Sequence, residues 1–184
     1  MKLLGPGAAA LASAMLVSAC ATSAEPDRGG QPADELRDVK AELRASSGQL
    51  RARSTAEQVG DSIRVRIEAD GLAPGAYGAH VHSTGRCDPP DFASAGPHWN
   101  PTDQKHGKDN PQGMHKGDLP NLLVGTDGRG SLEYTIPNAW IATGRTNVLL
   151  DADGAAIVIH QSPDDYRTDP SGNSGARIAC GVFG

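Results

Sequence analysis

Aromatic residues are scarce in this 184-residue chain, where only 4% of residues are Phe, Trp or Tyr. A hydrophobic core must therefore be built mainly from Val, Ile, Leu and Ala. Basic residues are also in deficit, because 17 Lys and Arg face 22 Asp and Glu and the formal net charge is −5. A chain this acidic is a poor candidate for binding nucleic acid, whose phosphates attract basic proteins. Long helical runs are lacking after residue 45, and frequent Gly and Pro favour many turns instead.

The N-terminus carries one charge, at Lys2, before an uncharged run of mostly Ala, Leu and Gly that reaches Ala19. A short apolar run after a positive start is typical of a secretory signal. A retained membrane anchor is the alternative, but a spanning helix needs about 20 residues of stronger hydrophobicity. Gly5, Pro6 and Gly7 also interrupt the run. We therefore predict that residues 1–19 are a signal peptide and that the remaining chain is exported.

The apolar run ends in Val17-Ser18-Ala19-Cys20, which resembles a bacterial lipobox, in which the Cys receives a lipid. Ordinary cleavage after Ala24 is the alternative. The chain has three cysteines, and an odd number in an exported protein leaves one without a partner. Lipidation of Cys20 accounts for the odd cysteine and leaves one pair. We therefore predict a lipoprotein of the periplasm or cell envelope, held to a membrane only by a lipid on Cys20, with the polar residues 20–39 as a flexible tether.

From about residue 40 the hydrophobic pattern alternates with a period of two, most clearly at residues 62–68 and 131–136. This alternation is typical of strands with one buried face. Three glycine-containing turns each separate two strand-like runs: Ser47-Gly48, Asp127-Gly128 and Asp153-Gly154. Apolar residues at helical spacing between 36 and 43 allow one short helix before the strands. The pattern predicts an all-β sandwich or barrel of about eight strands.

Two stretches rich in proline and glycine, residues 83–118 and 161–175, do not fit strands. Long loops in a compact domain are usually functional or disordered. All six histidines lie between residues 80 and 160, in or beside these loops, which indicates loops ordered by metal. His80 and His82 form a His-x-His pattern on a strand, so both rings point to the same face, although the pattern alone is a weak signal.

A stronger group of potential ligands falls within 21 residues of the first long loop: His98, His106, His115 and Asp118. Three imidazoles and one carboxylate are a closed tetrahedral set for zinc. The last histidine, His160, ends the apolar run 155–159, where a buried strand enters a loop. Six histidines and one aspartate are too many ligands for one ion, and nitrogen ligands suit copper while three histidines and a carboxylate suit zinc. Two ions have four ligands each if one imidazole serves both.

Five motifs follow one another along this region: Gly78-Ala79-His80-Val81-His82, Ser94-Ala95-Gly96-Pro97-His98-Trp99-Asn100-Pro101, Lys105-His106-Gly107, His115-Lys116-Gly117-Asp118-Leu119, and Gly172-Asn173-Ser174-Gly175-Ala176-Arg177-Ile178-Ala179-Cys180-Gly181-Val182. In order and spacing they resemble the motifs of copper–zinc superoxide dismutases, over about residues 40–184. The resemblance implies a Greek-key β-sandwich or barrel with two long metal-bearing loops. It also implies one copper ion and one zinc ion per subunit.

The resemblance assigns a role to each motif residue. The implied copper ligands are His80, His82, His98 and His160. The implied zinc ligands are His98, His106, His115 and Asp118, so that His98 serves both ions. Asp164 matches an outer aspartate that hydrogen-bonds two ligand rings, those of His80 and His106, and fixes their orientation. Arg177 matches the arginine beside the copper.

Cys87 and Cys180 match the family's disulfide, which pins the first metal-bearing loop to the last strand. A disulfide suits an exported protein, because such proteins meet an oxidising compartment. Closing a loop of roughly 94 residues contributes about 4–5 kcal/mol in the chain-entropy model.

The implied reaction is disproportionation of two superoxide anions into dioxygen and hydrogen peroxide, with His98 delivering a proton and Arg177 attracting the anion. One alternative is a copper-binding or copper-delivery protein on the same scaffold, which would typically lack a ligand or Arg177. A zinc hydrolase is a second alternative, but it needs an open zinc position, and four protein ligands close the site. The sequence leaves open whether two copies pair as a homodimer.

Overall fold

The computed structural model describes residues 1–2, 38–142 and 145–184 of the chain. The expected lipidated Cys20 lies outside the described residues, as do nearly all of the expected signal peptide (residues 1–19) and tether (residues 20–39). Within the described part, no helix is both long and apolar enough to cross a membrane. The first strand begins at Asp38, slightly before the expected start of the domain at residue 40.

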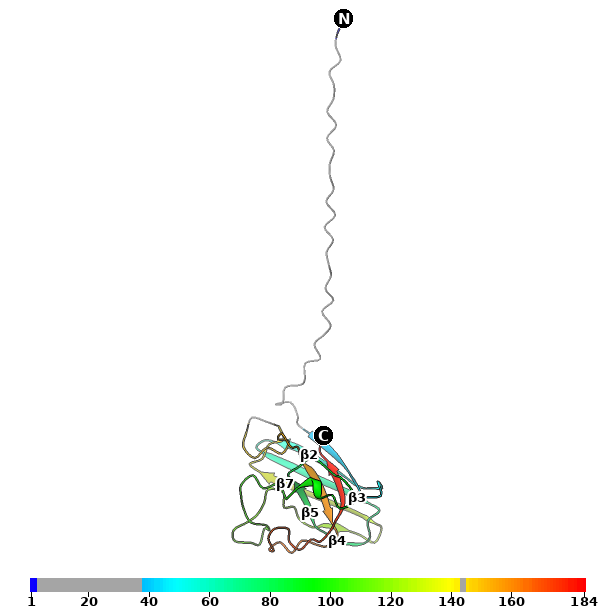
Figure 1. Cartoon of the computed structure of the whole chain (residues 1–184), viewed down its shortest axis with the longest axis vertical. Coiled ribbons are helices and arrows are strands. Elements are labelled where there is room, and N and C mark those ends of the chain that lie inside the picture. The colour runs from blue at the N-terminus through cyan, green and yellow to red at the C-terminus, as the bar shows by residue number, and fades with distance from the viewer. Residues whose placement is uncertain (3–37, 143–144) are drawn as a thin grey trace. The chain divides into compact units, whose positions relative to one another are not determined.

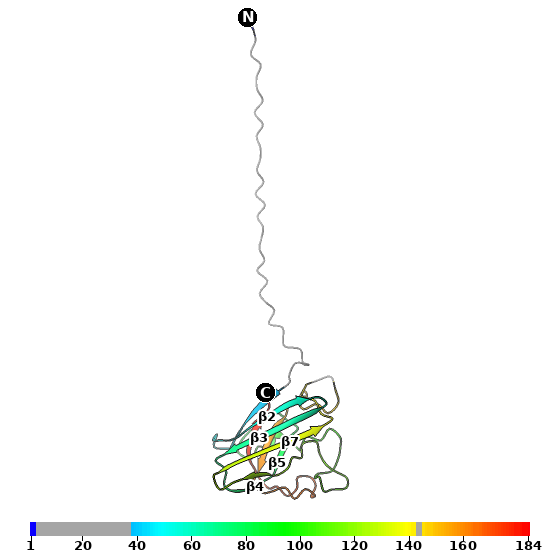
Figure 2. The same cartoon turned by 180° about the vertical axis from the view of Figure 1, so that it is seen from behind.

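The described residues form one antiparallel sheet of nine strands: β1 (Asp38–Arg44), β2 (Leu50–Val59), β3 (Ser62–Asp70), β4 (Gly75–Tyr77), β5 (Ala79–His82), β6 (Leu122–Val124), β7 (Arg129–Pro137), β8 (Ala156–His160) and β9 (Arg177–Val182). Their spatial order is β4-β6-β7-β3-β2-β1-β9-β8-β5. The two edge strands, β4 and β5, are separated along the chain only by Gly78, so the sheet nearly closes into a barrel. Figure 1 presents β5 in front, and Figure 2 presents β2, β3 and β7.

Long connections bring strands that are distant in sequence side by side, as a Greek-key arrangement requires: β3 lies beside β7, β1 beside β9, and β5 beside β8. The prediction of an all-β barrel is therefore confirmed, with nine strands where about eight were expected. The three-residue strands β4 and β6 are too short to show an alternating pattern in the sequence. No α-helix occurs in the described ranges, and η2 (Ala93–Ala95) is a single 3-10 turn.

The prediction of a short helix over residues 36–43 is wrong for its described part, which belongs to β1. Val39, Ala41 and Leu43 are buried there and alternate with exposed polar residues. Residues four apart, such as Val39 and Leu43, lie on one face of either a helix or a strand. Pairing with β2 along the length of β1 decides between the two structures.

The barrel core is aliphatic, as the scarcity of aromatic residues requires. In β3, Ile63, Val65 and Ile67 are at most 1% exposed. Ile63 pairs with Ile136 of β7 and Ile67 pairs with Leu132, so apolar side chains meet across neighbouring strands. This core supports the strands that carry the histidines on the other side of the barrel.

Two of the three predicted glycine turns connect strands. Gly48, with φ 84°, lies between β1 and β2, and Gly128, with φ 79°, lies between β6 and β7. Asp153-Gly154 is a turn before β8, but the prediction that a strand precedes it is wrong. The described residues between β7 and this turn contain no strand, and Trp140 and Val148 form an isolated bridge there, so the turn leads from irregular chain into β8.

The free edge of β5 is covered by the long connection 83–121. Val81 of β5 donates its backbone N–H to the carbonyl of Gly117 (2.9 Å) and accepts one from Trp99 (2.8 Å). A side chain at position 117 would overlap the Val81 carbonyl, so this close approach requires glycine. The connection is thus fastened to the strand that bears the His-x-His pattern.

Candidate metal centre

Two neighbouring strands, β5 and β8, bring three histidines together. His80 and His82 lie on β5, and His160 is the last residue of β8. The ring centroids of His80 and His160 are 4.8 Å apart, and those of His82 and His160 are 5.7 Å apart. Val81, between the first two, points instead into the hydrophobic core. The strand geometry alone therefore presents three imidazoles at one place.

The connection 83–121 supplies the remaining predicted ligand residues. Isolated β-bridges pair His98 with His82 and Asp118 with His80, which places both beside β5. His106 and His115 lie between them in the sequence and fold back onto Asp118. Pairing with β5 therefore positions His98 and Asp118, and Asp118 in turn positions His106 and His115.

The seven residues form two groups whose potential ligand atoms all lie within 4.8 Å of one another. The strand set consists of His80, His82, His98 and His160. The loop set consists of His98, His106, His115 and Asp118. His98 belongs to both sets, and its ring centroid lies 4.0 Å from that of His80 and 5.5 Å from that of His115. None of the seven residues is more than 6% exposed, so both sets are shielded from water.

Each outward ring nitrogen of three strand-set histidines faces an acceptor. The pairs are His80 Nε2 with Asp164 Oδ2 (2.9 Å), His82 Nδ1 with the Gly96 carbonyl (2.9 Å), and His160 Nδ1 with the Gly175 carbonyl (3.2 Å). An acceptor at that distance requires the outward nitrogen to carry the proton. In a neutral imidazole the inward nitrogen then carries no proton, and this is the form that binds a metal.

Asp118 organises the loop set. Its Oδ1 lies 2.9 Å from His98 Nδ1, 3.1 Å from His115 Nδ1 and 3.1 Å from His106 Nδ1. Its Oδ2 accepts the backbone N–H groups of Gly107 (2.9 Å) and His115 (3.0 Å). Three imidazole nitrogens thus converge beside one carboxylate oxygen, a composition that suits four-coordinate zinc.

Three buried side-chain nitrogens within the described ranges have no hydrogen-bond partner: His80 Nδ1, His98 Nε2 and His106 Nδ1. His106 Nδ1 is near Asp118 Oδ1 but lacks the angles of a hydrogen bond. A buried nitrogen without a partner is costly. Since the first two lie on the strand-set side and the third in the loop set, metal ions in the two sets would satisfy all three. The residues present therefore fit one copper and one zinc ion.

Asp164 links the two sets from outside. Its Oδ2 accepts His80 Nε2 (2.9 Å), and its Oδ1 accepts His106 Nε2 (3.0 Å). One buried carboxylate thereby orients one ring of each set. Burial opposes its negative charge, but the hydrogen bonds from His106 and His80 prevail and hold the pKa of Asp164 well below its usual range.

The surroundings of these histidines favour different charge states. Burial lowers the pKa of His160 to about 3 and that of His98 to about 4, and it holds the pKa of His82 well below its ordinary value. For His106, burial is outweighed by the carboxylates of Asp118 and Asp164, which raise its pKa to about 9. The rings of His82, His98 and His160 are therefore neutral near pH 7, whereas the ring of His106 is protonated and its charge is compensated by the two carboxylates.

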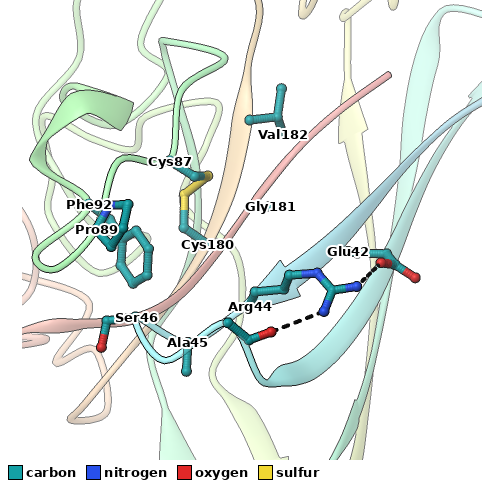
Figure 3. A pocket seen from close by; sticks show the side chains of 11 residues that line it. Glu42, Arg44, Ala45, Ser46, Cys87, Pro89, Phe92, Cys180, Gly181 and Val182 are labelled. Atoms are coloured by element: carbon teal, nitrogen blue, oxygen red, sulfur yellow. Dashed lines mark hydrogen bonds and ion pairs between the residues drawn. A yellow bond between two sulfur atoms is a disulfide. The ribbon is translucent and has the colours of Figure 1, made fainter.

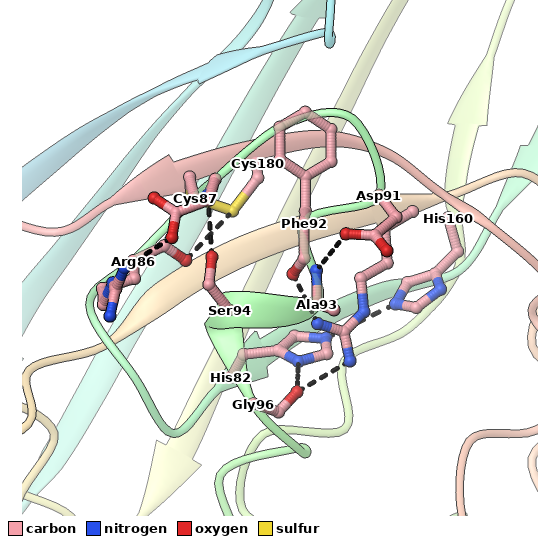
Figure 4. The surroundings of a disulfide bond; sticks show 12 residues. His82, Arg86, Cys87, Asp91, Phe92, Ala93, Ser94, Gly96, His160 and Cys180 are labelled. Carbon is pink, nitrogen blue, oxygen red and sulfur yellow. Dashed lines mark hydrogen bonds and ion pairs between the residues drawn. A yellow bond between two sulfur atoms is a disulfide. The ribbon is translucent and has the colours of Figure 1, made fainter.

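Arg177, the first residue of β9, lies half-buried next to the strand set. Its Nη1 donates to the Phe92 carbonyl (2.6 Å), and its Nη2 donates to the Gly96 carbonyl (2.7 Å). The Gly96 carbonyl also accepts His82 Nδ1 (Figure 4), so one backbone oxygen joins Arg177 to a strand-set ring. Gly96 has φ 75°, a conformation that favours glycine and turns this carbonyl toward both partners.

A disulfide joins Cys87 to Cys180 across 93 residues, with a Cα–Cα distance of 5.6 Å (Figure 4). It ties the connection 83–121 to β9. A small apolar cluster packs around it: Phe92, Ala95, Ala156 and Val158. The segment whose carbonyls hold Arg177 is thus fixed to the strand that carries Arg177.

A hollow of about 280 Å³ lies beside the same disulfide (Figure 3). Arg44 lines it, pairs with Glu42 (2.6 Å) and donates to the Gly48 carbonyl (3.0 Å). None of the seven predicted ligand residues lines this hollow. It is therefore not part of the metal centre.

Sequence reasoning missed three groups that hold the predicted residues in place. The side chain of Asn121 makes two hydrogen bonds to the backbone of Asp164, accepting its N–H (2.7 Å) and donating to its carbonyl (2.9 Å). A Cβ at Gly172 would overlap Asp164 Oδ1 and lie 2.6 Å from His106 Nε2. Gly172 and Gly96 lie within the recognised motifs, and these glycines could have indicated close backbone contacts. No motif or spacing marks Asn121.

Comparison with known proteins agrees with this geometry. The sequence model of the copper/zinc superoxide dismutase family matches residues 46–183. Superoxide dismutase (Cu-Zn) 1 of Aquifex aeolicus is 42% identical over 153 residues, which cover 82% of this chain and 89% of that protein. The superoxide dismutase-like protein YojM of Bacillus subtilis is 47% identical over 124 residues, 67% of this chain and 63% of that protein.

Solved structures give the same result. The crystal structure of a SOD-like protein from Bacillus subtilis matches with a TM-score of 0.74 at 41% identity, covering 78% of this chain and 96% of that one. The family match begins just after β1, extends to the last strand and includes all seven predicted ligand residues. The chain belongs to the copper/zinc superoxide dismutase family.

Proposed function

We propose that the protein is a superoxide dismutase that holds copper in the strand set and zinc in the loop set. The observation that carries the proposal is the pair of buried four-residue sets that share the single ring of His98. Four imidazole nitrogens suit copper, whereas three imidazoles and a carboxylate suit zinc. Four protein ligands would close the zinc site, which disfavours the alternative of a zinc hydrolase.

When bound, copper supplies one-electron chemistry, and zinc supplies a fixed charge without redox chemistry. The protein's part is to deliver protons and to admit the anion. His98 Nδ1 lies against Asp118, and His98 Nε2 lies on the side of the strand set. A proton held at Nε2 is therefore placed where superoxide is reduced.

Arg177 positions the substrate anion in this account. A guanidinium carries five N–H donors and keeps its charge at all physiological pH values. The carbonyls of Phe92 and Gly96 each accept one donor and hold the group rigidly. The remaining donors can bind a small anion beside the strand set. This local positive charge compensates for the net negative charge of the chain.

The test is metal analysis of the purified protein together with a superoxide-scavenging assay. We expect one copper and one zinc per chain, and loss of activity when copper is removed. Protein that binds both metals but does not scavenge superoxide would favour the alternative of a copper-binding or copper-delivery protein. Hydrolytic activity that survives copper removal would favour the zinc hydrolase.

The proposal includes export and lipid anchoring. The charge pattern of residues 1–19 and the lipobox-like ending at Cys20 support an exported lipoprotein. The Cys87–Cys180 disulfide supports an oxidising compartment such as the periplasm. Pairing of two copies stays a prediction, which size-exclusion chromatography checks.

Replacement of the proposed lipid-bearing residue tests the anchor. We expect Cys20→Ser to move the protein from the membrane fraction to the soluble fraction without loss of dismutase activity, because the domain and its disulfide are unchanged. Fractionation of cells that express each form measures this. A variant that remains in the membrane fraction would contradict lipid anchoring at Cys20.

A further inference from the structure

The segment 161–176 holds the loop-set residue His106 at more than one point. At the ring, Asp164 Oδ1 accepts His106 Nε2 (3.0 Å). At the backbone, Asp169 Oδ1 accepts the N–H of His106 (2.9 Å). The second oxygen of Asp169 accepts Lys105 Nζ (3.2 Å). Two carboxylates from one segment therefore hydrogen-bond the same histidine, one at its ring and one at its backbone.

The neighbouring residues tighten this contact. Tyr166 accepts the backbone N–H of Asp109 through its carbonyl (3.0 Å), which draws the segment 161–176 against the loop set. A Cβ at Gly107 would overlap this Tyr166 carbonyl, so the two backbones meet directly after His106. His106 is 0% exposed, and its ring has no freedom to adjust if its backbone shifts. The position of the His106 backbone thus sets where Nδ1 points.

We propose that Asp169 is a positioning residue for the zinc site, which fixes the backbone of His106 so that Nδ1 meets the metal. The proposal rests on the assignment of zinc to the loop set. Asp169 is not a ligand, because it touches His106 through the backbone N–H and not through the ring. The hydrogen bond from the His106 N–H, and then that from Lys105, lower the pKa of Asp169, so its carboxylate is charged at neutral pH.

The two contacts of Asp169 have different expected weights. The ion pair with Lys105 is exposed, with side chains 55% and 38% accessible, and such pairs contribute little. The bond to the His106 N–H is partly buried and constrains a ligand. Hydrogen-bonded partners of metal ligands typically alter metal affinity by about 10–100-fold. The hydrogen bond, and not the ion pair, should therefore retain zinc.

Three variants separate these contributions in the metal-loaded full-length protein. D169A removes both contacts, D169N keeps an oxygen that can accept the His106 N–H, and K105Q removes only the ion pair. The matched control is D165A, because Asp165 accepts hydrogen bonds from Arg167, Thr168 and Asn173 within its own segment. Zinc release to a chromogenic chelator gives the rate, and hydrogen exchange of the His106 amide reports the bond itself.

We expect D169A to release zinc about tenfold faster and to lose protection of the His106 amide. D169N, K105Q and D165A should remain within about twofold of wild type. A D169A protein that releases zinc at the wild-type rate overturns the proposal. Equal acceleration in D165A also overturns it, because general loosening of the segment would then explain the effect.

If D169A does not fold, D169S repeats the test, because a serine hydroxyl is too short to reach the His106 amide. Cobalt substituted for zinc supplies an independent signature, since its visible spectrum reports ligand geometry and should change in D169A but not in K105Q. The failure of this proposal is distinguishable from failure of the proposed function. Wild-type protein that binds no zinc would overturn the function itself, whereas wild-type retention with no effect of D169A overturns only the role of Asp169.

Discussion

The strand set and the loop set share His98 but are built by different means. Three residues of the strand set, His80, His82 and His160, lie on paired strands whose backbone geometry brings their rings together. The loop set lies in irregular chain. Its residues are arranged by carboxylates, with Asp118 at the centre and Asp164 outside. The sheet therefore preforms one set, and hydrogen bonds to buried charges organise the other.

This difference predicts where each set is vulnerable. A strand-borne ring can be removed with little effect on the backbone, so only the metal that it binds should be lost. A loop-borne set depends on partners that are not ligands, so changes outside the set should release its metal. The two sets are joined by the ring of His98, by the carboxylate of Asp164 and by the β-bridge between Asp118 and His80.

Removal of a strand-set ligand should have the largest effect. We expect His160→Ala to lower copper content and to reduce dismutase activity by more than about a hundredfold, beyond the range for indirect partners. Zinc content should remain near wild type, because His160 touches no loop-set carboxylate. Elemental analysis and the superoxide assay measure both. The adjacent exposed residue provides the control, Gln161→Ala, and full activity in His160→Ala would refute the copper assignment.

Removal of the outer carboxylate should loosen the loop set more than the strand set. Asp164→Asn keeps the shape but cannot accept hydrogen bonds from both His80 and His106. We expect zinc release to accelerate by about 10–100-fold, with a smaller change in copper release. Chelator competition measures the two rates. Asp165→Asn is the matched control. Equal rates of zinc release for Asp164→Asn and wild type would show that the hydrogen bonds of Asp164 to His80 and His106 do not organise the loop set.

Acid should destabilise the metal-free protein through the strand set. The pKa of His160 is about 3 and that of His98 about 4 in the folded protein, against an ordinary value of 6.5. Between pH 6.5 and about 4 the unfolded chain therefore binds protons that the folded chain does not. The free energy of unfolding should fall by about 2–3 kcal/mol for each such histidine.

The contribution of His106, in the loop set, has the opposite dependence on pH. The pKa of His106 is raised to about 9, so its stabilising contribution is complete below pH 6.5 and is lost as the pH rises through 9. Urea unfolding of metal-free protein at pH 6.5, 4.5 and 9.5 measures the loss of stability in acid and the loss in alkali. His160→Asn should reduce the decrease in the free energy of unfolding between pH 6.5 and 4.5. Equal stability at pH 6.5 and 4.5 would contradict the buried, neutral strand set.

The smallest expected effect is on substrate attraction beside the strand set. Arg177→Ala should keep both metals. It should slow turnover by about tenfold, because one charged hydrogen bond to the substrate is lost, and it should weaken the dependence of the rate on salt. Arg86→Ala is the control, because Arg86 is exposed, pairs with Asp88 and changes the net charge equally. Kinetics at low and high ionic strength compare them. Identical salt dependence in the two variants would remove the proposed role of Arg177.

The strand set was the easier part to predict from the sequence. A period of two puts His80 and His82 on one face without any knowledge of the fold, and His160 marks the end of a buried apolar run. The barrel was equally readable in β3 and β7, where long alternating runs pair in register. Prediction failed for β1, because residues four apart satisfy helix and strand alike.

The residues that hold the loop set in place could not be predicted in the same way. Its ligands are marked by residue type, but their partners come from distant segments and from backbone atoms. Asn121 and Asp169 carry no distinctive spacing, and their contacts depend on how the segment 161–176 lies against the loop. Such contacts are set by tertiary packing, which no local pattern encodes.

The central claim is that one imidazole, that of His98, joins two metal ions. The most direct test is to load copper(II) into both sets and to record the electron paramagnetic resonance spectrum. Two copper ions bridged by one ring should couple magnetically, and His98→Ala should abolish the coupling. Two independent copper signals in the wild-type protein, unchanged by His98→Ala, would contradict the account.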